Sequence, residues 1–285
     1  MAGSALTSDA TLFDRRAWRL HRDRAAGIAA DFLHLEVVER LIDRLDLVNR
    51  EFLTVLDLGA RDGALTRRLA ERSIRAWCVA ADPSPHLAAA TPTPHVCADP
   101  ELIPFRDSGF DLAASCLVLH WCSDLPGALI QLRRALKPDG LLLAAMLGGN
   151  TLIELRTALF EAELAEEGGV SPRVSPTIEL GDAAALLQRA GFAMPVADSE
   201  TITVTYPDML ALMRDLRGMG ETNALAARRR FLSRATIARA SAIYAERFGD
   251  TDSRIPATFD VLFLTGWAPH PDRAKPRSGP RRRIS

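Results

Sequence analysis

Residues 55–63, Val-Leu-Asp-Leu-Gly-Ala-Arg-Asp-Gly, decide the fold of this chain. An apolar run containing an acid leads into a turn with two glycines, and a helical pattern begins directly after the second glycine. This order predicts a buried strand, a turn and the N-terminus of a helix. Glycines at such a turn let the backbone approach a ligand, and the helix N-terminus favours the ligand's negative group. Glycine turns also close sheets that bind nothing, so the motif alone is weak.

Outward from this turn, short apolar runs alternate with helical patterns. The runs end in small, acidic or turn residues and cover residues 52–58, 76–81, 95–98, 112–115 and 141–147. Helical stretches lie between them, including 63–71 and 125–136, and Pro138 with Gly140 ends the second of these. Strands that alternate with helices predict an α/β fold with a doubly wound parallel sheet.

The second half of the chain predicts two more strands with a long insertion between them. The pattern indicates, in order, one helix closed by Gly191 and two strands, over residues 182–189, 201–206 and 258–267. About fifty residues separate the two strands, with helical patterns at 209–216 and 237–248, and a loop of that length is uncommon. We therefore expect a helical lid, residues 207–256, inserted before the last strand.

Both ends of the chain differ from its middle. Residues 1–50 carry an arginine-rich stretch and then apolar residues at helical spacing, which predicts an N-terminal helical segment before a domain over 51–267. Residues 268–285 shift to Pro, Gly, Ser and Arg, with six cationic residues against one acid. Such a segment cannot bury enough apolar surface to fold alone. We expect a disordered basic tail there, with contact to an anionic lipid or a partner as the alternative.

Composition excludes several classes of protein. The 285 residues contain 35 Lys and Arg against 36 Asp and Glu, a net charge of −1, so no basic field points to nucleic acid. No apolar stretch approaches the about 18 residues of a spanning helix, and residues 1–30 lack a signal core. We expect a protein that is not integral to a membrane and lies in the reducing cytoplasm. Structural roles are expected for the cysteines, none of which forms a C-x-x-C pair: Cys78, Cys97, Cys116 and Cys122.

Two further acids follow predicted strands. Asp82 lies 23 residues after Gly59, at the end of the second strand, where a carboxylate can accept both hydroxyls of a ribose. Asp99 ends the third strand and can accept the exocyclic amine of an adenine, beside an apolar wall at 102–105. Each acid taken singly is more often a cap or a turn residue. Together with Asp57, they place three acids at successive strand ends and predict a site for an adenosine-bearing ligand.

Residues 55–146 resemble the class I S-adenosylmethionine-dependent methyltransferases. The likeness rests on the glycine turn, Asp82, the Asp99 segment, Phe110-Asp111-Leu112 and Leu136-Lys137-Pro138-Asp139-Gly140. A dehydrogenase-type Rossmann domain shares the glycine turn, but the Asp99 segment and the two late strands are more similar to the methyltransferase fold. The resemblance implies a seven-stranded Rossmann-like sheet. It also implies that S-adenosylmethionine is held by Asp57, Gly59, Gly63, Asp82, Asp99 and Cys116.

Two positions depart from that family's pattern. Arg61 stands where the turn normally has glycine, and its cationic side chain would crowd or repel a sulfonium unless it turns outward. Pro100 follows the adenine-binding acid and has no N–H to offer the ring. Losing one such hydrogen bond would weaken binding by about 0.5–1.5 kcal/mol. Together the two departures would either abolish the binding of S-adenosylmethionine or only tune its affinity.

Segments beyond the cofactor motifs narrow the resemblance. They comprise residues 119–126, 146–156, 168–176, 206–209, 217–223 and 255–259, with Phe13-Asp14-Arg15 near the N-terminus. These segments resemble the bacterial relatives of the mitochondrial complex I assembly factor that has this fold. The resemblance implies hydroxylation of an arginine on a complex I subunit during assembly. A neighbouring family shares the Trp-Cys-x-x-Leu neighbourhood and methylates the malonyl group on a carrier protein for biotin synthesis.

Four residues are candidates for chemistry. His120, just past the fourth strand, is the best candidate base and Trp121 the best wall for a substrate or cofactor, although a histidine there is as often a loop anchor. Glu154 and Glu221 can hold a substrate guanidinium through paired hydrogen bonds, with capping or surface pairing as the alternative. No two-His-one-carboxylate spacing is present, so the sequence predicts no metal site and names no oxidant.

Three hypotheses follow for the function. The first is an assembly enzyme that modifies an arginine of a complex I subunit. The second is a methyltransferase acting on a small molecule or on the malonyl carboxylate of a carrier protein. The third, motivated by Arg61 and Pro100, is a non-catalytic assembly chaperone with a degenerate cofactor pocket. The predicted partner is a protein rather than a nucleic acid. The predicted location is the cytoplasm, with peripheral contact to the inner membrane through the basic tail, and the matrix side of mitochondria for eukaryotic relatives.

Overall fold

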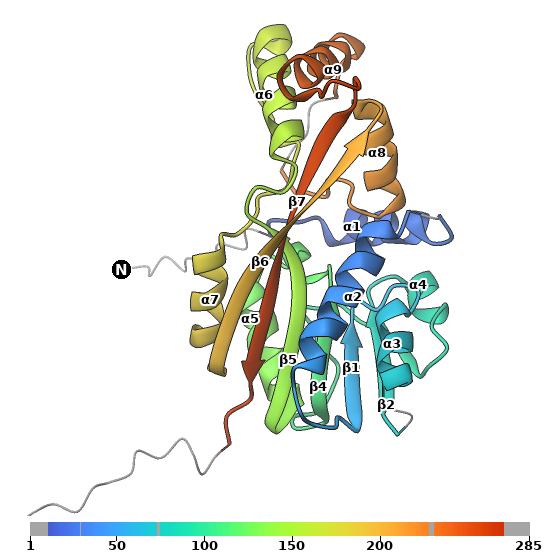
Figure 1. Cartoon of the computed structure of the whole chain (residues 1–285), viewed down its shortest axis with the longest axis vertical. Helices are drawn as coiled ribbons and strands as arrows, with labels where there is room; N and C mark the ends of the chain where they lie inside the picture. Colours follow the sequence, from blue (N-terminus) through green and yellow to red (C-terminus); the bar gives the residue numbers. More distant parts are fainter. Residues whose placement is uncertain (1–10, 29, 73–74, 228–230, 271–285) are drawn as a thin grey trace, which may run out of the picture.

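The computed structural model describes residues 11–28, 30–72, 75–227 and 231–270. Seven strands form one sheet in the order β3-β2-β1-β4-β5-β7-β6, which confirms the predicted doubly wound α/β sheet (Figure 1). The strands are β1 (Thr54–Leu58), β2 (Trp77–Asp82), β3 (His95–Cys97), β4 (Phe110–Cys116), β5 (Leu136–Gly148), β6 (Ala193–Tyr206) and β7 (Ile255–Trp267). Neighbours among β1 to β5 pair in parallel, whereas β7 is antiparallel to both β5 and β6.

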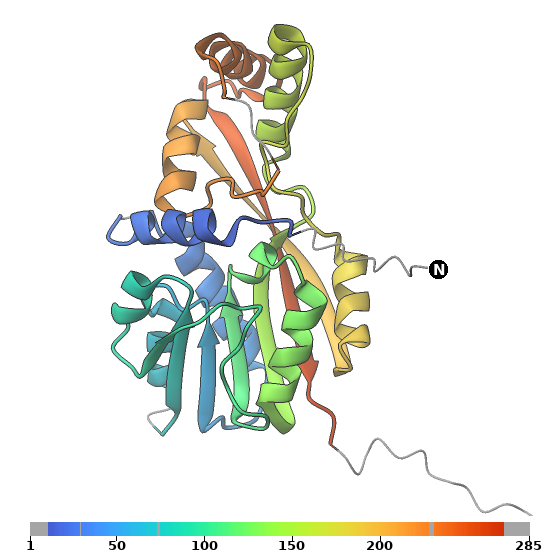
Figure 2. The same ribbon diagram turned by 180° about the vertical axis from the view of Figure 1, so that it is seen from behind.

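Helices cover both faces of this sheet. In chain order they are α1 (Arg15–Ala25), α2 (Phe32–Asp46), α3 (Ala64–Arg72), α4 (Pro85–Ala89), the 3₁₀ turn η1 (Leu119–Trp121), α5 (Leu125–Ala135), α6 (Ile153–Glu167), α7 (Leu180–Arg189), α8 (Met209–Gly218) and α9 (Arg234–Phe248). Helices α2 and α3 lie on one face, and α5 and α7 lie on the other (Figures 1 and 2). The strand order reverses between β1 and β4, so their carboxyl ends flank the crevice where ligands of such folds bind.

The two faces arise from the alternation of side chains along each strand. In β1, Val55 belongs to the apolar cluster that contains Leu41 of α2, whereas Leu56 belongs to the cluster that contains Leu129 of α5. Successive residues of a strand point to opposite faces, so a strand buried on both sides is apolar almost throughout. For this reason the buried strands of the sheet appear in the sequence as short continuous apolar runs.

A helical lid stands on the long ends of β6 and β7. These two strands continue past the carboxyl edge of the parallel strands, and α6, α8 and α9 gather around the extension (Figures 1 and 2). Helices α8 and α9 match the predicted helical patterns, but α6 was not predicted. Its apolar residues occupy more than one side of the helix, with Leu155 and Leu159 buried and Phe160 and Leu164 exposed, so no single amphipathic stripe marks it.

Strand β6 begins earlier than the pattern indicated. The prediction began at residue 201, but β6 runs from Ala193 and pairs with β7 over nearly its whole length. Residues 196–200, Val-Ala-Asp-Ser-Glu, do not alternate apolar with polar side chains, and the register shifts between Ala193 and Val196. Pairing with β7 therefore extends a strand that its own sequence does not mark.

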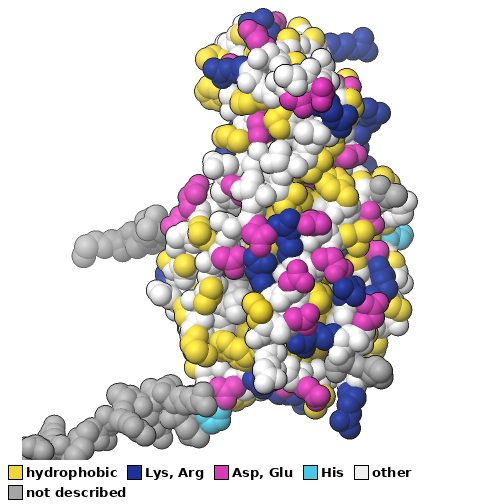
Figure 3. Space-filling model, viewed as in Figure 1, with side chains coloured by type: hydrophobic (Ala, Val, Ile, Leu, Met, Phe, Trp, Pro, Cys, Tyr) yellow, Lys and Arg dark blue, Asp and Glu magenta, His cyan; other side chains and the backbone are white. Residues whose placement is uncertain are grey.

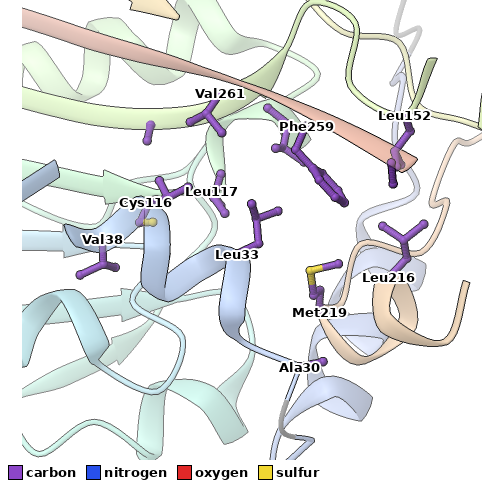
Figure 4. Packing of buried hydrophobic residues seen from close by; sticks show 14 of the residues in the cluster. Ala30, Leu33, Val38, Cys116, Leu117, Leu152, Leu216, Met219, Phe259 and Val261 are labelled. Carbon is purple, nitrogen blue, oxygen red and sulfur yellow. The ribbon is translucent and has the colours of Figure 1, made fainter. Parts of the chain in front are cut away.

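Apolar packing joins the lid to the sheet. One apolar cluster contains both the side chains between α2 and the sheet and four residues nearer the lid: Leu152, Leu216, Met219 and Phe259. Figure 4 shows how these four side chains lie close to one another. Outside this core, acidic and basic side chains intersperse over the face that carries α2 and β6 (Figure 3). Arg44 of α2 forms ion pairs there with Asp198 and with Glu200, the latter at 2.6 Å.

Two further predictions concern membrane-spanning helices and the basic C-terminal tail. In the part of the chain that the structure describes, no helix has the length and apolar character to cross a bilayer. The predicted basic tail falls largely on residues 271–285, which lie outside the described residues.

Candidate functional site

The glycine turn after β1 brings the backbone close to the neighbouring strand. Gly59 and Gly63 have φ angles of +82° and +84°, a region that residues with a Cβ rarely adopt. A Cβ at Gly59 would lie 2.5 Å from the Val118 side chain, beyond the end of β4. The turn therefore requires glycine at this position, and α3 begins directly after the second glycine at Ala64.

Arg61 lies inside this turn instead of pointing outward. Its φ is +50°, its side chain is buried, and its Nη1 donates to the carbonyl of Met219 at 2.6 Å. Burial and the nearby Arg22 lower the pKa of the guanidinium from its ordinary value. Arg61 thus connects the cofactor-type turn with the end of α8, and its side chain occupies room that a turn glycine would leave open.

Asp82, the predicted ribose acceptor, is bound by the chain itself. Arg22 of α1 donates to it from Nη2 at 2.5 Å and from Nε at 3.3 Å. The backbone N–H groups of Arg61 and Ser84 donate to the same carboxylate at 3.0 and 2.9 Å. Arg22 and Asp82 are both fully buried, and the pKa of Arg22 is raised because Asp82 outweighs the effect of burial. These four donors occupy the carboxylate of Asp82 from within the chain.

Asp99, the predicted adenine acceptor, has a similar partner. Arg15 of α1 donates to both of its oxygens, from Nε at 2.9 Å and from Nη2. The N–H of Glu101 donates to Asp99 at 2.9 Å, two residues along the chain. Arg15 also donates from Nη1 to the carbonyl of Trp121 at 2.8 Å. The two acids that a nucleoside would need are therefore both occupied by arginines of α1.

Asp57 and Cys116 lie deeper, in the sheet itself. Asp57 accepts from the hydroxyl of Thr66 at 2.7 Å, and its Oδ1 is buried without a hydrogen-bond partner. Burial raises the pKa of Asp57 to about 7. Cys116 is buried, with its thiol 3.9 Å from the carbonyl oxygen of His34, and burial raises its thiol pKa well above the ordinary value. Cys116 therefore has the environment of an inert core thiol.

A separate cavity lies between the sheet edge and the lid. It has a volume of about 180 Å³ and is lined by η1, the end of β5, α6, the 173–177 loop, α8 and residues 221–223. His120, Trp121 and Glu221, which sequence reasoning selected separately, meet in its wall. Most of the remaining lining is apolar, including Leu155 and Met213.

Glu221 is oriented by the two neighbouring ring nitrogens. Nε2 of His120 and Nε1 of Trp121 each lie 3.1 Å from its Oε2. Nδ1 of His120 accepts from the N–H of Leu147 at 3.4 Å, so a neutral imidazole carries its proton on Nε2 and donates to Glu221. Burial alone would raise the pKa of Glu221, but His120, Arg22 and Trp121 outweigh burial and lower it. The cavity wall therefore presents a carboxylate.

Glu154 lies away from this group. Its carboxylate accepts from the N–H of Thr258 at 3.2 Å and from the Thr258 hydroxyl. Glu154 is buried and does not line the cavity, so it fastens the start of α6 to β7. The predicted pairing of Glu154 with Glu221 around one guanidinium does not occur in this arrangement.

Sequence reasoning missed the role of the α1 arginines. Arg15 and Arg22 are seven residues apart, which places them on one face of a helix, two turns from each other. That spacing was available from the sequence, but nothing in it indicated that the face would meet Asp82 and Asp99. Among the described residues, no group of three His, Cys, Asp or Glu side chains is placed to bind a metal ion.

Fold and site geometry define the class of this protein. The sheet order, the glycine turn and the acids at the ends of β2 and β3 are those of a class I methyltransferase fold. A family model described as a methyltransferase domain matches residues 56–144. The solved YcgJ protein from Bacillus subtilis superposes with a TM-score of 0.56 at 16% identity, covering 81% of this chain and 99% of that one, which shows the fold alone.

Sequence comparison shows the family. The chain is 41% identical over 273 residues to arginine-hydroxylase NDUFAF5, mitochondrial, from Danio rerio, covering 93% of this chain and 85% of that protein. It is 35% identical over 288 residues to malonyl-(acyl-carrier protein) O-methyltransferase from Methylovorus, covering 95% of each. The chain belongs to the methyltransferase-fold family that contains arginine-hydroxylase NDUFAF5, to which malonyl-(acyl-carrier protein) O-methyltransferase is related.

The methyltransferase class implies S-adenosylmethionine, and the residues present can be tested against it. Its ribose would need Asp82 and its adenine would need Asp99. Arginines of α1 hold both carboxylates, and Arg61 replaces a turn glycine. In the arrangement described, these residues therefore do not fit that cofactor.

Proposed function

We propose that this chain binds an arginine side chain of a protein substrate in the Glu221 cavity and takes part in its hydroxylation during the assembly of respiratory complex I, with the oxygen atom supplied by a two-electron oxidant from outside the chain. The single observation that carries the proposal is an oriented carboxylate in a small, mostly apolar cavity. The relatives named arginine-hydroxylase, at about 40% identity over most of the chain, support the choice of arginine.

The charge and hydrogen bonding of Glu221 suit a guanidinium. Both recorded hydrogen bonds go to Oε2, and among the described residues none goes to Oε1. Because the pKa of Glu221 is lowered, the group is a carboxylate at neutral pH. A guanidinium would donate to Oε1, while His120 and Trp121 keep the carboxylate fixed.

Size and lining favour a side chain over a free small molecule. Pockets for drug-sized ligands are typically about 300–1,000 Å³, whereas this cavity is about 180 Å³. An arginine would lay its aliphatic stem along Leu155, Leu216 and Met213 and place its charged head at Glu221. These walls come from the sheet edge, α6 and α8, so the lid forms part of the proposed substrate site.

The test is the mass of the substrate arginine in cells. Deletion of the gene should leave one arginine of a complex I subunit without its added oxygen atom, as measured by peptide mass spectrometry. Wild type and Glu166→Gln should restore the modification, because Glu166 is exposed on α6, whereas Glu221→Gln should not. An arginine mass that is identical in the parent and the deletion strain would refute the proposal.

A carboxylate substrate is the second candidate. Arg217 of α8 lies in the cavity wall. A cation in that position suits a malonyl carboxylate, and the relatives named malonyl-(acyl-carrier protein) O-methyltransferase support this alternative. Incubation with a malonyl carrier protein and S-adenosylmethionine would then yield a methyl ester that Arg217→Gln reduces. No ester with the wild-type chain removes this candidate.

A further inference from the structure

Helix α1 presents two arginines to the acids at the carboxyl edge of the sheet. Arg22 binds Asp82 at the end of β2, and Arg15 binds Asp99 just after β3. The arginines lie on one helix face, and the two acids stand where a nucleoside would place its ribose and its adenine. One helix therefore covers both recognition groups at once.

The Arg22 contact leaves Asp82 no room for a second ligand. Two guanidinium nitrogens and two backbone N–H groups already donate to this carboxylate, and Arg22 and Asp82 are 2% and 0% exposed. Ribose hydroxyls could reach the carboxylate only after Arg22 had left. Arg22 in turn could leave only if α1 moved, because its side chain is enclosed.

The same helix is attached to the lid. The N–H of Asp14 donates to Ala224 at 2.7 Å, the N–H of Ala226 donates to Leu12 at 2.9 Å, and the ring of His21 lies 3.1 Å from the carbonyl of Thr222. These contacts flank Glu221. Displacement of α1 would therefore release the segment that carries the cavity carboxylate.

We propose that α1 is a built-in competitor for the adenosine site. Arg22 and Arg15 occupy Asp82 and Asp99 in the closed chain, and an adenosine-bearing ligand binds only when α1 is displaced. Binding of an adenosine-bearing ligand at the sheet edge and an ordered segment at residues 219–226 therefore exclude each other. The proposal is argued from the contacts of α1 alone, so it does not depend on which substrate the Glu221 cavity takes.

The first test is the affinity for S-adenosylhomocysteine, measured by calorimetry on the full chain. Removal of both arginine charges in Arg15→Gln/Arg22→Gln should increase the affinity about tenfold or more over wild type. The matched control is Arg16→Gln/Arg19→Gln, which removes the same charge from exposed positions of the same helix and should leave the affinity unchanged. If the first variant is folded, equal or weaker binding by it, or no binding, overturns the proposal.

A second measurement covers the case in which loss of Arg22 unfolds the chain. Circular dichroism reports the fold, and Arg15→Gln alone is the milder variant because Arg15 and Asp99 are partly exposed. It should bind S-adenosylhomocysteine more tightly than Arg16→Gln does, and equal or weaker binding overturns the proposal.

In any variant that binds and retains Arg22, saturating ligand should speed amide hydrogen exchange in residues 15–25 and 219–226. Slower or unchanged exchange there would show that α1 and the ligand are compatible.

Discussion

Arg61 combines two unfavourable features at the scale of a single residue. Its φ of +50° lies in the left-handed region, where a residue with a Cβ is strained, and its guanidinium is buried. The hydrogen bond to the Met219 carbonyl compensates part of that cost and ties the turn to the lid. The residue that departs from the family pattern is therefore built into the closed arrangement.

We expect Arg61→Gly to raise the affinity for S-adenosylhomocysteine about tenfold. Glycine adopts this φ without strain and removes a buried cation from the turn. Calorimetry on wild type, Arg61→Gly and Arg67→Gln would test this, because Arg67 is a more exposed arginine of α3. If Arg61→Gly binds no better than Arg67→Gln, Arg61 does not obstruct the site.

Asp57 makes stability depend on pH. Burial raises its pKa from 3.8 to about 7, so the folded chain binds this proton more tightly than the unfolded chain does. The contribution to stability is full below about pH 4 and is lost as the pH rises toward about 7, by up to about 1.4 kcal/mol per pH unit. Asp57→Asn should not show this loss.

Urea unfolding at about pH 5 and about pH 8 measures that effect. The free energy of unfolding of wild type relative to Asp57→Asn should fall between the two conditions, because only wild type then ionises a buried carboxyl. A difference between the two proteins that stays constant with pH would mean that Asp57 is already ionised at the lower pH.

At the scale of elements, the lid is assembled from separate parts of the chain. Helix α6 follows β5, whereas α8 and α9 lie between β6 and β7, and α6 packs beside α9 (Figure 1). The carboxylate of Glu154 fastens α6 to β7 through Thr258. This contact sets the position of the helix that supplies one wall of the Glu221 cavity.

We expect Glu154→Gln to destabilise α6. A charge-assisted hydrogen bond is lost in a buried place, which costs about 1–3 kcal/mol. Faster amide exchange in residues 153–167 would report the change, with Glu166→Gln as the exposed control on the same helix. Equal exchange in the two variants would show that Glu154 does not hold the helix.

At the scale of the whole molecule, one apolar core crosses from the sheet into the lid. Phe259 is fully buried and lies among Leu152, Leu216 and Met219, where β7 runs past its pairing with β5 (Figure 4). Because this packing is shared, the lid and the sheet should unfold together rather than as separate units.

We expect Phe259→Ala to lower the free energy of unfolding by about 3–5 kcal/mol and to leave a single urea transition. The cavity it creates lies between lid and sheet, so both parts lose packing. Phe160→Ala removes a ring that is 51% exposed on α6 and should cost much less. Two separated transitions in wild type would contradict a shared core.

The sequence predicted more of the fold than of the contacts within the site. Val55, Leu56 and the other buried strand residues marked the parallel strands because burial on both faces demands apolar runs. Helix α6 was not predicted because its apolar residues lie on both its buried and its exposed sides. His120 and Glu221 were selected as separate candidates about a hundred residues apart, and no local pattern stated that they would be in contact.

From its order of residues alone, this protein's parallel strands, its glycine turn and the acids that follow its second and third strands could be derived, because each depends on local burial and backbone conformation. Only the tertiary structure decided how those acids are used. Arg22 reaches Asp82 and Arg15 reaches Asp99 because α1 lies across the carboxyl edge of the sheet, a position set by packing between distant segments. Side-chain charges show which groups attract one another, whereas the packed chain decides which of them meet.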